Sequence, residues 1–209
     1  IPVELGLLAQ DGRALPLQLQ GEDAPGATSR TVVLSEPRQT LRFVNVDSAP
    51  VPSLLRGFSA PVVLDLDYSD AELLTLLAHD SYAFTRWEAG QRLLLRCAIN
   101  SIAASAIPIS ASAIFEQNFL SEPVLQALRQ VLRDPALDAA YKELLLTLPS
   151  ETYIAEQLDV VDPQRVHAVR EAMRLQLPLP LQADWHWAYE SPHDRTLYPP
   201  DPVSPGRRA

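Results

Sequence analysis

Residues 57–60 (GFSA) are the most suggestive chemical pattern in the sequence, because they match the start of the G-x-S-x-G nucleophile elbow. That motif places a serine on a sharp turn between a strand and a helix, where backbone amides stabilise an oxyanion. Here Pro61 replaces the last glycine, and the apolar run 62–66 predicts a strand instead of a helix. We therefore expect Ser59 to form local hydrogen bonds at a strand end and not to act as a nucleophile.

Metal binding is the second chemistry to consider. No two of the four histidines are four residues apart and none lies in an H-E-x-x-H motif, the arrangement that presents two imidazoles to one zinc ion. A site assembled in space from His186, His193 and Asp194 is conceivable, but surface histidines beside a proline-rich loop are the better interpretation. The other two histidines are His79 and His167.

Three other groups of residues have structural explanations that outweigh the functional ones. Asp65 and Asp67 lie on one face of the predicted strand and could divide acid and base roles, but a strand end favours solvated carboxylates. Trp185 and Trp187 flank His186 and could line a ligand site, yet aromatic residues at this spacing are typical of helix packing. Cys97 lies in an apolar helix and is expected to pack as a small hydrophobic residue. We therefore assign no catalytic, cofactor-binding or metal-binding residue in this chain.

The first third of the chain carries β-strand signals. Residues 3–9 and 15–19 flank Asp11-Gly12, a dipeptide typical of a hairpin turn. Further short strands are predicted at 31–34, 39–46 and 62–66. This spacing predicts an antiparallel β-sandwich, which about 65 residues would complete only in part.

Helix signals begin at Ser69-Asp70-Ala71-Glu72, a capping box followed by apolar residues on one face. A second helix is predicted over 82–102. Its apolar stripe, interrupted by the polar Gln91, comprises Phe84, Trp87, Leu94, Leu95, Ala98 and Ile102.

Later helix starts are predicted from capping residues. Pro108 rules out a continuous helix through the segment that follows the second helix. Asp134-Pro135, Ser150 and Asp162-Pro163 then predict new helix starts. The predicted fold is two-part, β then α: a partial antiparallel β-sandwich over 1–67 and an all-α helical array over 68–209.

Composition limits the possible functions. The 209 residues are 47% hydrophobic and carry a net charge of −9 with no basic stripe, so a buried core is expected and nucleic acid is an unsuitable partner. No apolar run reaches the ~18–20 residues that a membrane-spanning helix needs. The single cysteine and the lack of a signal sequence favour a cytoplasmic location. The chain begins in a strand pattern without methionine, and it ends in SPGRRA, which resembles the first turn of an unfinished helix. We therefore expect both ends to be fragment boundaries.

Four segments resemble the bacterial aminopeptidase N family, the zinc-dependent alanyl aminopeptidases. They occur in the family's order along nearly the whole chain, and comprise EPRQTLRFVNV (36–46), PVPSLLRGFSAPVVLDLDYSD (50–70), LLAHDSYAFTRWEAGQRLL (76–94) and LPSETYIAEQLDVVDPQRVHAVREAM (148–173). The resemblance implies a fragment that begins inside a small β-sandwich domain and ends inside a large helical domain.

In that family a thermolysin-like domain precedes these two domains and removes the N-terminal residue of peptides. The resemblance implies zinc in the parent enzyme, bound outside this chain, since neither H-E-x-x-H nor G-x-M-E-N occurs here. The implied partners are the catalytic domain of the same polypeptide and peptide substrates. The expected role of the fragment is to space the domains and help wall the active-site chamber. The alternative is a stand-alone, non-enzymatic module that binds a protein or peptide.

Overall fold

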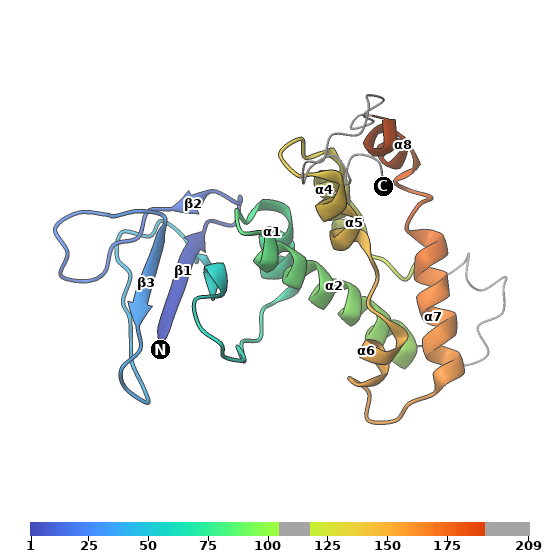
Figure 1. The fold of residues 1–209 in the computed structure, drawn as a ribbon, viewed down its shortest axis with the longest axis horizontal. Helices are drawn as coiled ribbons and strands as arrows, with labels where there is room; N and C mark the ends of the chain where they lie inside the picture. Colours follow the sequence, from blue (N-terminus) through green and yellow to red (C-terminus); the bar gives the residue numbers. More distant parts are fainter. Residues whose placement is uncertain (105–117, 191–209) are drawn as a thin grey trace, which may run out of the picture. The chain divides into compact units, whose positions relative to one another are not determined.

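A computed structural model describes residues 1–104 and 118–190 of the chain (Figure 1). The chain divides into two compact units, Ile1–Ala89 and Gly90–Ala209. Helix α2 (Ala83–Ala104) begins in the first unit and ends in the second. An antiparallel sheet precedes a series of helices, which confirms the predicted β-then-α fold class.

The sheet is built around strand β1 (Pro2–Leu8), which pairs antiparallel with each of the other three strands. These are β2 (Ala14–Leu15), β3 (Ser29–Val33) and β4 (Val51–Leu54). The registers place Leu7 opposite Leu15 in β2 and Glu4 opposite Thr31 in β3. Leu7 also lies opposite Pro52 in β4.

The predicted turn at Asp11-Gly12 joins β1 to β2. Gly12 has a φ of 86°, a left-handed conformation that glycine adopts without steric cost. The amide of Ala9 donates to the carbonyl of Arg13 over 2.8 Å, which closes the turn. The hairpin prediction is therefore confirmed.

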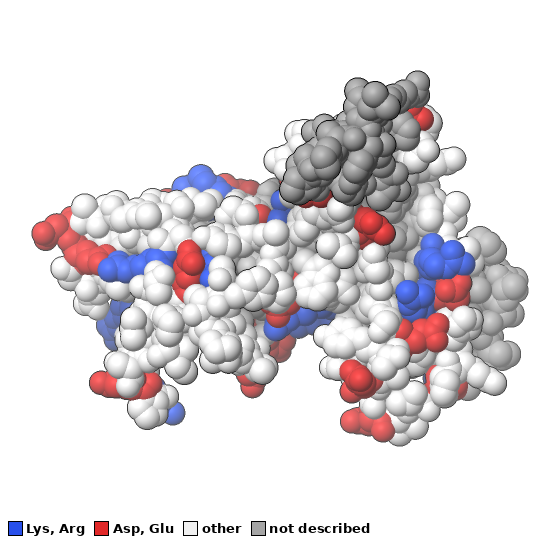
Figure 2. Space-filling view, viewed as in Figure 1, with Lys and Arg blue, Asp and Glu red and all other residues white. Residues whose placement is uncertain are grey.

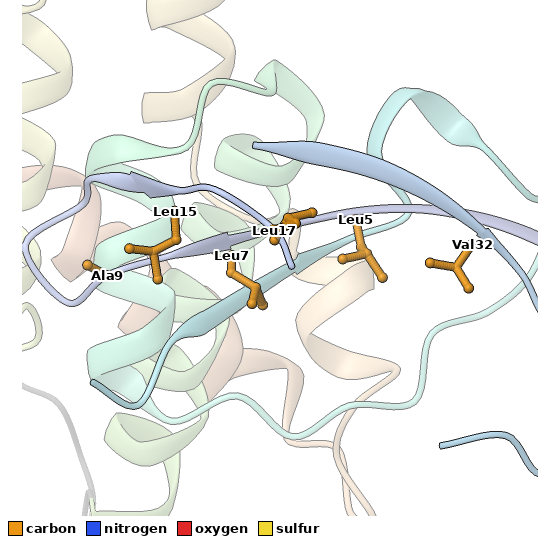
Figure 3. Close-up of a cluster of buried hydrophobic side chains, with 6 residues drawn as sticks. All are labelled: Leu5, Leu7, Ala9, Leu15, Leu17 and Val32. Atoms are coloured by element: carbon orange, nitrogen blue, oxygen red, sulfur yellow. The ribbon is translucent and has the colours of Figure 1, made fainter. Parts of the chain in front are cut away.

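Alternate residues of β1 and its neighbours form the core of the sheet (Figure 3). Leu5, Leu7 and Ala9 point to the same face because side chains alternate along a strand. The cluster also contains Leu15, Leu17 and Val32, and half-buried apolar residues from 41–54 pack against it.

Two predicted strands do not form, and one strand that was not predicted does. Residues 39–46 form only an isolated bridge between Leu19 and Phe43, because Asn45 with a φ of 57° interrupts the extended path. Residues 62–66 follow Pro61 and form no strand. Conversely, Val51–Leu54 forms β4, for which the sequence analysis predicted no strand.

Helix α1 (Asp70–His79) begins with the predicted capping box. Ser69 Oγ accepts a hydrogen bond from the Glu72 amide, and Glu72 Oε2 accepts one from the Ser69 amide over 2.8 Å. Its apolar face is buried through Leu73, Leu76 and Leu77. The second predicted helix is α2, but Phe84 and Trp87, the first two residues of its apolar stripe, are exposed.

The second unit contains short helices whose starts depend on local capping. α4 (Glu122–Arg133) packs against α5 (Ala139–Leu146) and α8 (Gln182–Glu190), and α6 (Glu151–Ala155) packs against α7 (Pro163–Gln176).

The predicted caps are confirmed at α6 and α7. Ser150 caps α6, and Asp162 caps α7 with Pro163 at its first position. The prediction at Asp134-Pro135 is wrong. Asp134 ends α4 and accepts from the Ala136 amide in a turn, and Asp138 instead caps α5.

The first compact unit includes α1 and the start of α2 as well as the sheet. The first unit therefore extends beyond residue 67, after which the sequence analysis places the domain boundary. That boundary stays a prediction. Within the described ranges, none of the helices combines the length and apolar character needed to cross a membrane.

Candidate functional site

A group of buried and half-buried polar side chains in the first unit surrounds Arg56, which lies in the short helix η1 (Arg56–Phe58). We call Arg56, Ser53, Asp80, Tyr82 and Glu4 the Arg56 cluster. Arg56 is 3% exposed and Asp80 is 1% exposed. Buried charges are costly unless they are paired and hydrogen-bonded.

The guanidinium of Arg56 contacts several separate segments. Its Nε donates to Ser53 Oγ over 2.8 Å, and Nη1 donates to the carbonyl of Thr28 over 3.3 Å. Nη2 lies 3.6 Å from Asp80 Oδ1, and the guanidinium carbon lies 4.7 Å from the centre of the Tyr82 ring. One side chain thereby connects the sheet to the corner between α1 and α2.

Gly6 in β1 provides the space for this guanidinium. A Cβ atom at position 6 would overlap Arg56 Nη1, so a larger residue would displace the arginine. The glycine therefore allows close approach of a charged side chain to a central strand.

Tyr82 connects the corner to the sheet by a second route. Its amide donates to Asp80 Oδ1 over 2.9 Å, and its hydroxyl donates to Glu4 Oε1 over 2.8 Å. The Ser29 hydroxyl donates to the same Glu4 oxygen. Hydrogen bonds from Tyr82 and then Ser29 lower the pKa of Glu4, with a smaller contribution from Arg56. Within the described part of the chain, buried Asp80 Oδ2 has no hydrogen-bond partner.

Arg86 stabilises the same corner. Its Nε donates to the carbonyl of Leu77 over 2.9 Å, and Nη2 donates to that of Ala78 over 3.2 Å. These carbonyls belong to the last turn of α1, where a cation also interacts favourably with the helix dipole. Side-chain hydrogen bonds therefore help to fix the conformation of the corner between α1 and α2.

Ser59, the candidate nucleophile, lies beside this cluster in a structural role. Its Oγ accepts a hydrogen bond from the Glu4 amide over 2.8 Å. The expected hydrogen bond is present, but its partner is 55 residues away in the sequence and not local. Residues 60–69, directly after Ser59, form no helix, so the strand-turn-helix of a nucleophile elbow is absent from this segment.

The histidines are not brought together where the structure describes them. His167 Nδ1 lies 2.8 Å from Glu151 Oε1 on an exposed surface, and the His79 ring lies beside Gly12. His186 is exposed, while His193 and Asp194 lie outside the described residues. Across 1–104 and 118–190, no three ligating side chains form a group that could hold a metal ion, so these residues do not fit a zinc site.

Trp185 and Trp187 lie on α8, half-buried, where Asp184 anchors the helix to α4. Asp184 Oδ1 accepts from Arg133 Nε over 2.7 Å, and Oδ2 accepts from Arg129 Nε over 3.0 Å. Burial alone would raise the pKa of Asp184, but the two arginines outweigh burial and lower it. Trp187 also lies 4.9 Å from the Arg133 guanidinium. The contact with Arg133 on α4 explains Trp187 through helix packing.

Asp65 and Asp67 are exposed, as expected for solvated carboxylates, although the strand predicted to carry them does not form. Cys97 is half-buried within α2. On the face drawn in Figure 2, acidic and basic side chains are interspersed.

Two family matches describe the two parts of the chain. Residues 1–67 match the family described as "Domain of unknown function (DUF3458) Ig-like fold", and residues 70–209 match "Domain of unknown function (DUF3458_C) ARM repeats". The class is therefore an Ig-like domain followed by ARM-repeat helices. The chain belongs to the DUF3458_C family.

Curated relatives carry the name aminopeptidase N. The Escherichia coli protein is 37% identical over 83% of this chain and 19% of its own length. The Caulobacter vibrioides protein is 34% identical over 85% of this chain, and the Haemophilus influenzae protein 32% identical over 90%. These matches confirm the resemblance to the aminopeptidase N family. The chain spans about a fifth of the length of these relatives.

A solved structure supports the fold. The structure of Legionella pneumophila aminopeptidase A in complex with aspartic acid has a TM-score of 0.69 and 23% sequence identity to this chain. The match covers 97% of this chain and 21% of that one. The order of sheet and helices is therefore shared with that protein.

Proposed function

We propose that these 209 residues form part of a longer polypeptide that acts as an aminopeptidase and removes N-terminal residues from peptides. The observation that carries this proposal is the match of 83–90% of the chain to three proteins named aminopeptidase N. Because the chain spans only about a fifth of those proteins, the catalytic machinery is expected elsewhere in the polypeptide.

The proposed parent enzyme is zinc-dependent, and its zinc is bound outside this chain. In support, the described residues do not fit a zinc site, and the sequence lacks H-E-x-x-H. A zinc ion of this kind would supply Lewis-acid activation of water in the parent. The isolated chain is proposed to be inactive, and the parent to be cytoplasmic.

The proposed role of this chain is to space the domains of the parent and to help wall its active-site chamber. The Arg56 cluster supports the spacing role, because it fixes the corner between α1 and α2 to the sheet through several independent contacts. A spacer transmits a defined geometry only if its joints are rigid.

The first experiment measures the natural polypeptide and its activity. An antibody raised to this chain would isolate the native protein for mass determination, zinc analysis and turnover of an alanyl anilide. We expect a species several times heavier than 23.1 kDa with zinc and activity. A native species of about 23 kDa would contradict the proposal and favour the stand-alone binding module.

The spacing role is tested in the full-length protein by removing contacts between the α1–α2 corner and the sheet. Arg56→Met should alter the ratio of kcat/KM for long peptides to that for dipeptides, because the chamber geometry changes. Arg38→Met, at an exposed arginine of the same unit, is the matched control. An unchanged ratio, with increased hydrogen exchange around residue 80, would refute the spacing role while leaving the aminopeptidase assignment intact.

A further inference from the structure

Three aromatic side chains of the first unit form an exposed group, which we call the aromatic patch: Phe58, Phe84 and Trp87. They are 71%, 42% and 36% exposed respectively. The ring centres of Phe58 and Phe84 are 4.6 Å apart, and those of Phe84 and Trp87 are 5.7 Å apart. Contiguous exposed aromatic surface is typical of an interaction site, whereas single exposed apolar residues are common.

The apolar pattern of α2 indicates that the aromatic patch packs against a partner. Phe84 and Trp87 continue the apolar stripe that includes Leu94 and Ala98, both of which are buried. On the same helix face, Leu94 and Ala98 are thus buried, whereas Phe84 and Trp87 contact solvent. An apolar stripe on a helix normally faces a packing partner.

The backbone beneath Phe58 is strained in a way that favours the same conclusion. Leu55, Gly57 and Phe58 have φ values of 55°, 59° and 53°. A left-handed conformation is unfavourable for a residue with a Cβ, and it persists only where surrounding contacts impose it. Here the buried contacts of Arg56 hold the segment. These contacts hold the Phe58 ring beside Phe84 while most of its surface stays exposed.

We infer that the aromatic patch is the surface on which an apolar segment of the same polypeptide, outside these 209 residues, docks. The length of the relatives supports this occupant, because about four-fifths of the E. coli protein lies outside the matched 19%. The chemistry supports an apolar partner, because aromatic anchors dominate binding energy and the nearby Arg56 is buried with partners of its own. The inference rests on the proposed membership in a longer aminopeptidase.

The test uses the full-length protein with the photoreactive analogue p-benzoylphenylalanine in place of Phe58. After irradiation, mass spectrometry should find position 58 cross-linked within one polypeptide to a segment outside these 209 residues. The same analogue at Val160, which is 85% exposed in the second unit, is the control for non-specific capture. Products confined to these 209 residues, products joining two copies, or no product above the Val160 control would each overturn the inference.

A second measurement avoids dependence on the analogue. In hydroxyl-radical footprinting of the full-length protein, Trp87 should be modified at least about fivefold more slowly than in the unfolded protein, as expected for the dry centre of an interface. Phe58→Asn removes the ring but suits the left-handed backbone, and should raise Trp87 modification about threefold or more. Val160→Asn should not change it. Wild-type reactivity matching the partial exposure described here would overturn the inference, whatever the peptidase activity.

Discussion

The guanidinium of Arg56 occupies the space beside Gly6 in which any larger residue would place its Cβ atom. This arrangement puts a buried cation against the central strand of the sheet, between a Ser53 hydroxyl and an Asp80 carboxylate. The identity of Gly6 and the position of Arg56 are therefore interdependent, although 50 residues of sequence separate them.

Replacing Arg56 should strongly destabilise the first unit. Arg56→Met is expected to cost about 3–5 kcal/mol, because Asp80 would remain buried without its cation. Urea unfolding of the 209-residue chain measures this loss, with Arg38→Met as the exposed control. Adding Asp80→Asn to Arg56→Met should recover part of the loss. Equal effects of the Arg56 and Arg38 substitutions would show that the buried pair contributes little.

Enlarging Gly6 should destabilise the chain through steric overlap alone. Gly6→Ala is expected to cost about 1–3 kcal/mol or more, because the guanidinium must move from its partners. Gly26→Ala is the matched control, since a Cβ there would meet only the Leu17 carbonyl at 3.4 Å. Thermal unfolding distinguishes the two. A Gly6→Ala protein as stable as the control would mean that Arg56 has an alternative position of similar energy.

Removing the Ser59 hydroxyl should affect stability and not catalysis. Ser59→Ala leaves the Glu4 amide without its acceptor and is expected to cost about 1–3 kcal/mol. The proposed peptidase activity of the full-length protein should be unchanged at a temperature where the variant is folded. Loss of turnover in a folded Ser59→Ala protein would revive the serine-nucleophile hypothesis.

Asp184 should make the attachment of α8 sensitive to acid. Its pKa is lowered from the ordinary value of 3.8, because the two arginine contacts outweigh burial. Its contribution to stability is therefore complete above that ordinary value and is lost as the pH falls through the lowered one. At pH 7, Asp184→Asn is expected to cost about 1–3 kcal/mol.

The check on Asp184 compares unfolding free energies of wild type and Asp184→Asn between pH 7 and pH 2. The difference between the two proteins should shrink as the pH falls below about 4. Asp159→Asn, at an exposed carboxylate before α7, controls for the change in net charge. A difference that stays constant down to pH 2 would contradict an electrostatic role for Asp184.

Elements that depend on neighbouring residues were predictable from the sequence. The capping box at Ser69, the Asp162-Pro163 start of α7 and the Asp11-Gly12 hairpin each rest on contacts within a few residues. Asp134-Pro135 shows the limit of such signals, because the same dipeptide can form a turn after a helix instead of beginning one. The sequence also lacks an H-E-x-x-H motif, and the assignment of no site residue stays a prediction.

The Arg56 cluster was not predictable, because its hydrogen bonds join residues 28 and 78 positions apart along the chain. Strand β4 was missed for the same reason, since its pairing with β1 depends on a partner almost fifty residues earlier in the sequence. Likewise, the stripe on α2 identified an apolar face, but its pattern could not distinguish buried Leu94 from exposed Trp87. Local sequence determines the conformation of a helix or strand and which of its faces is apolar. Long-range packing determines which face is buried.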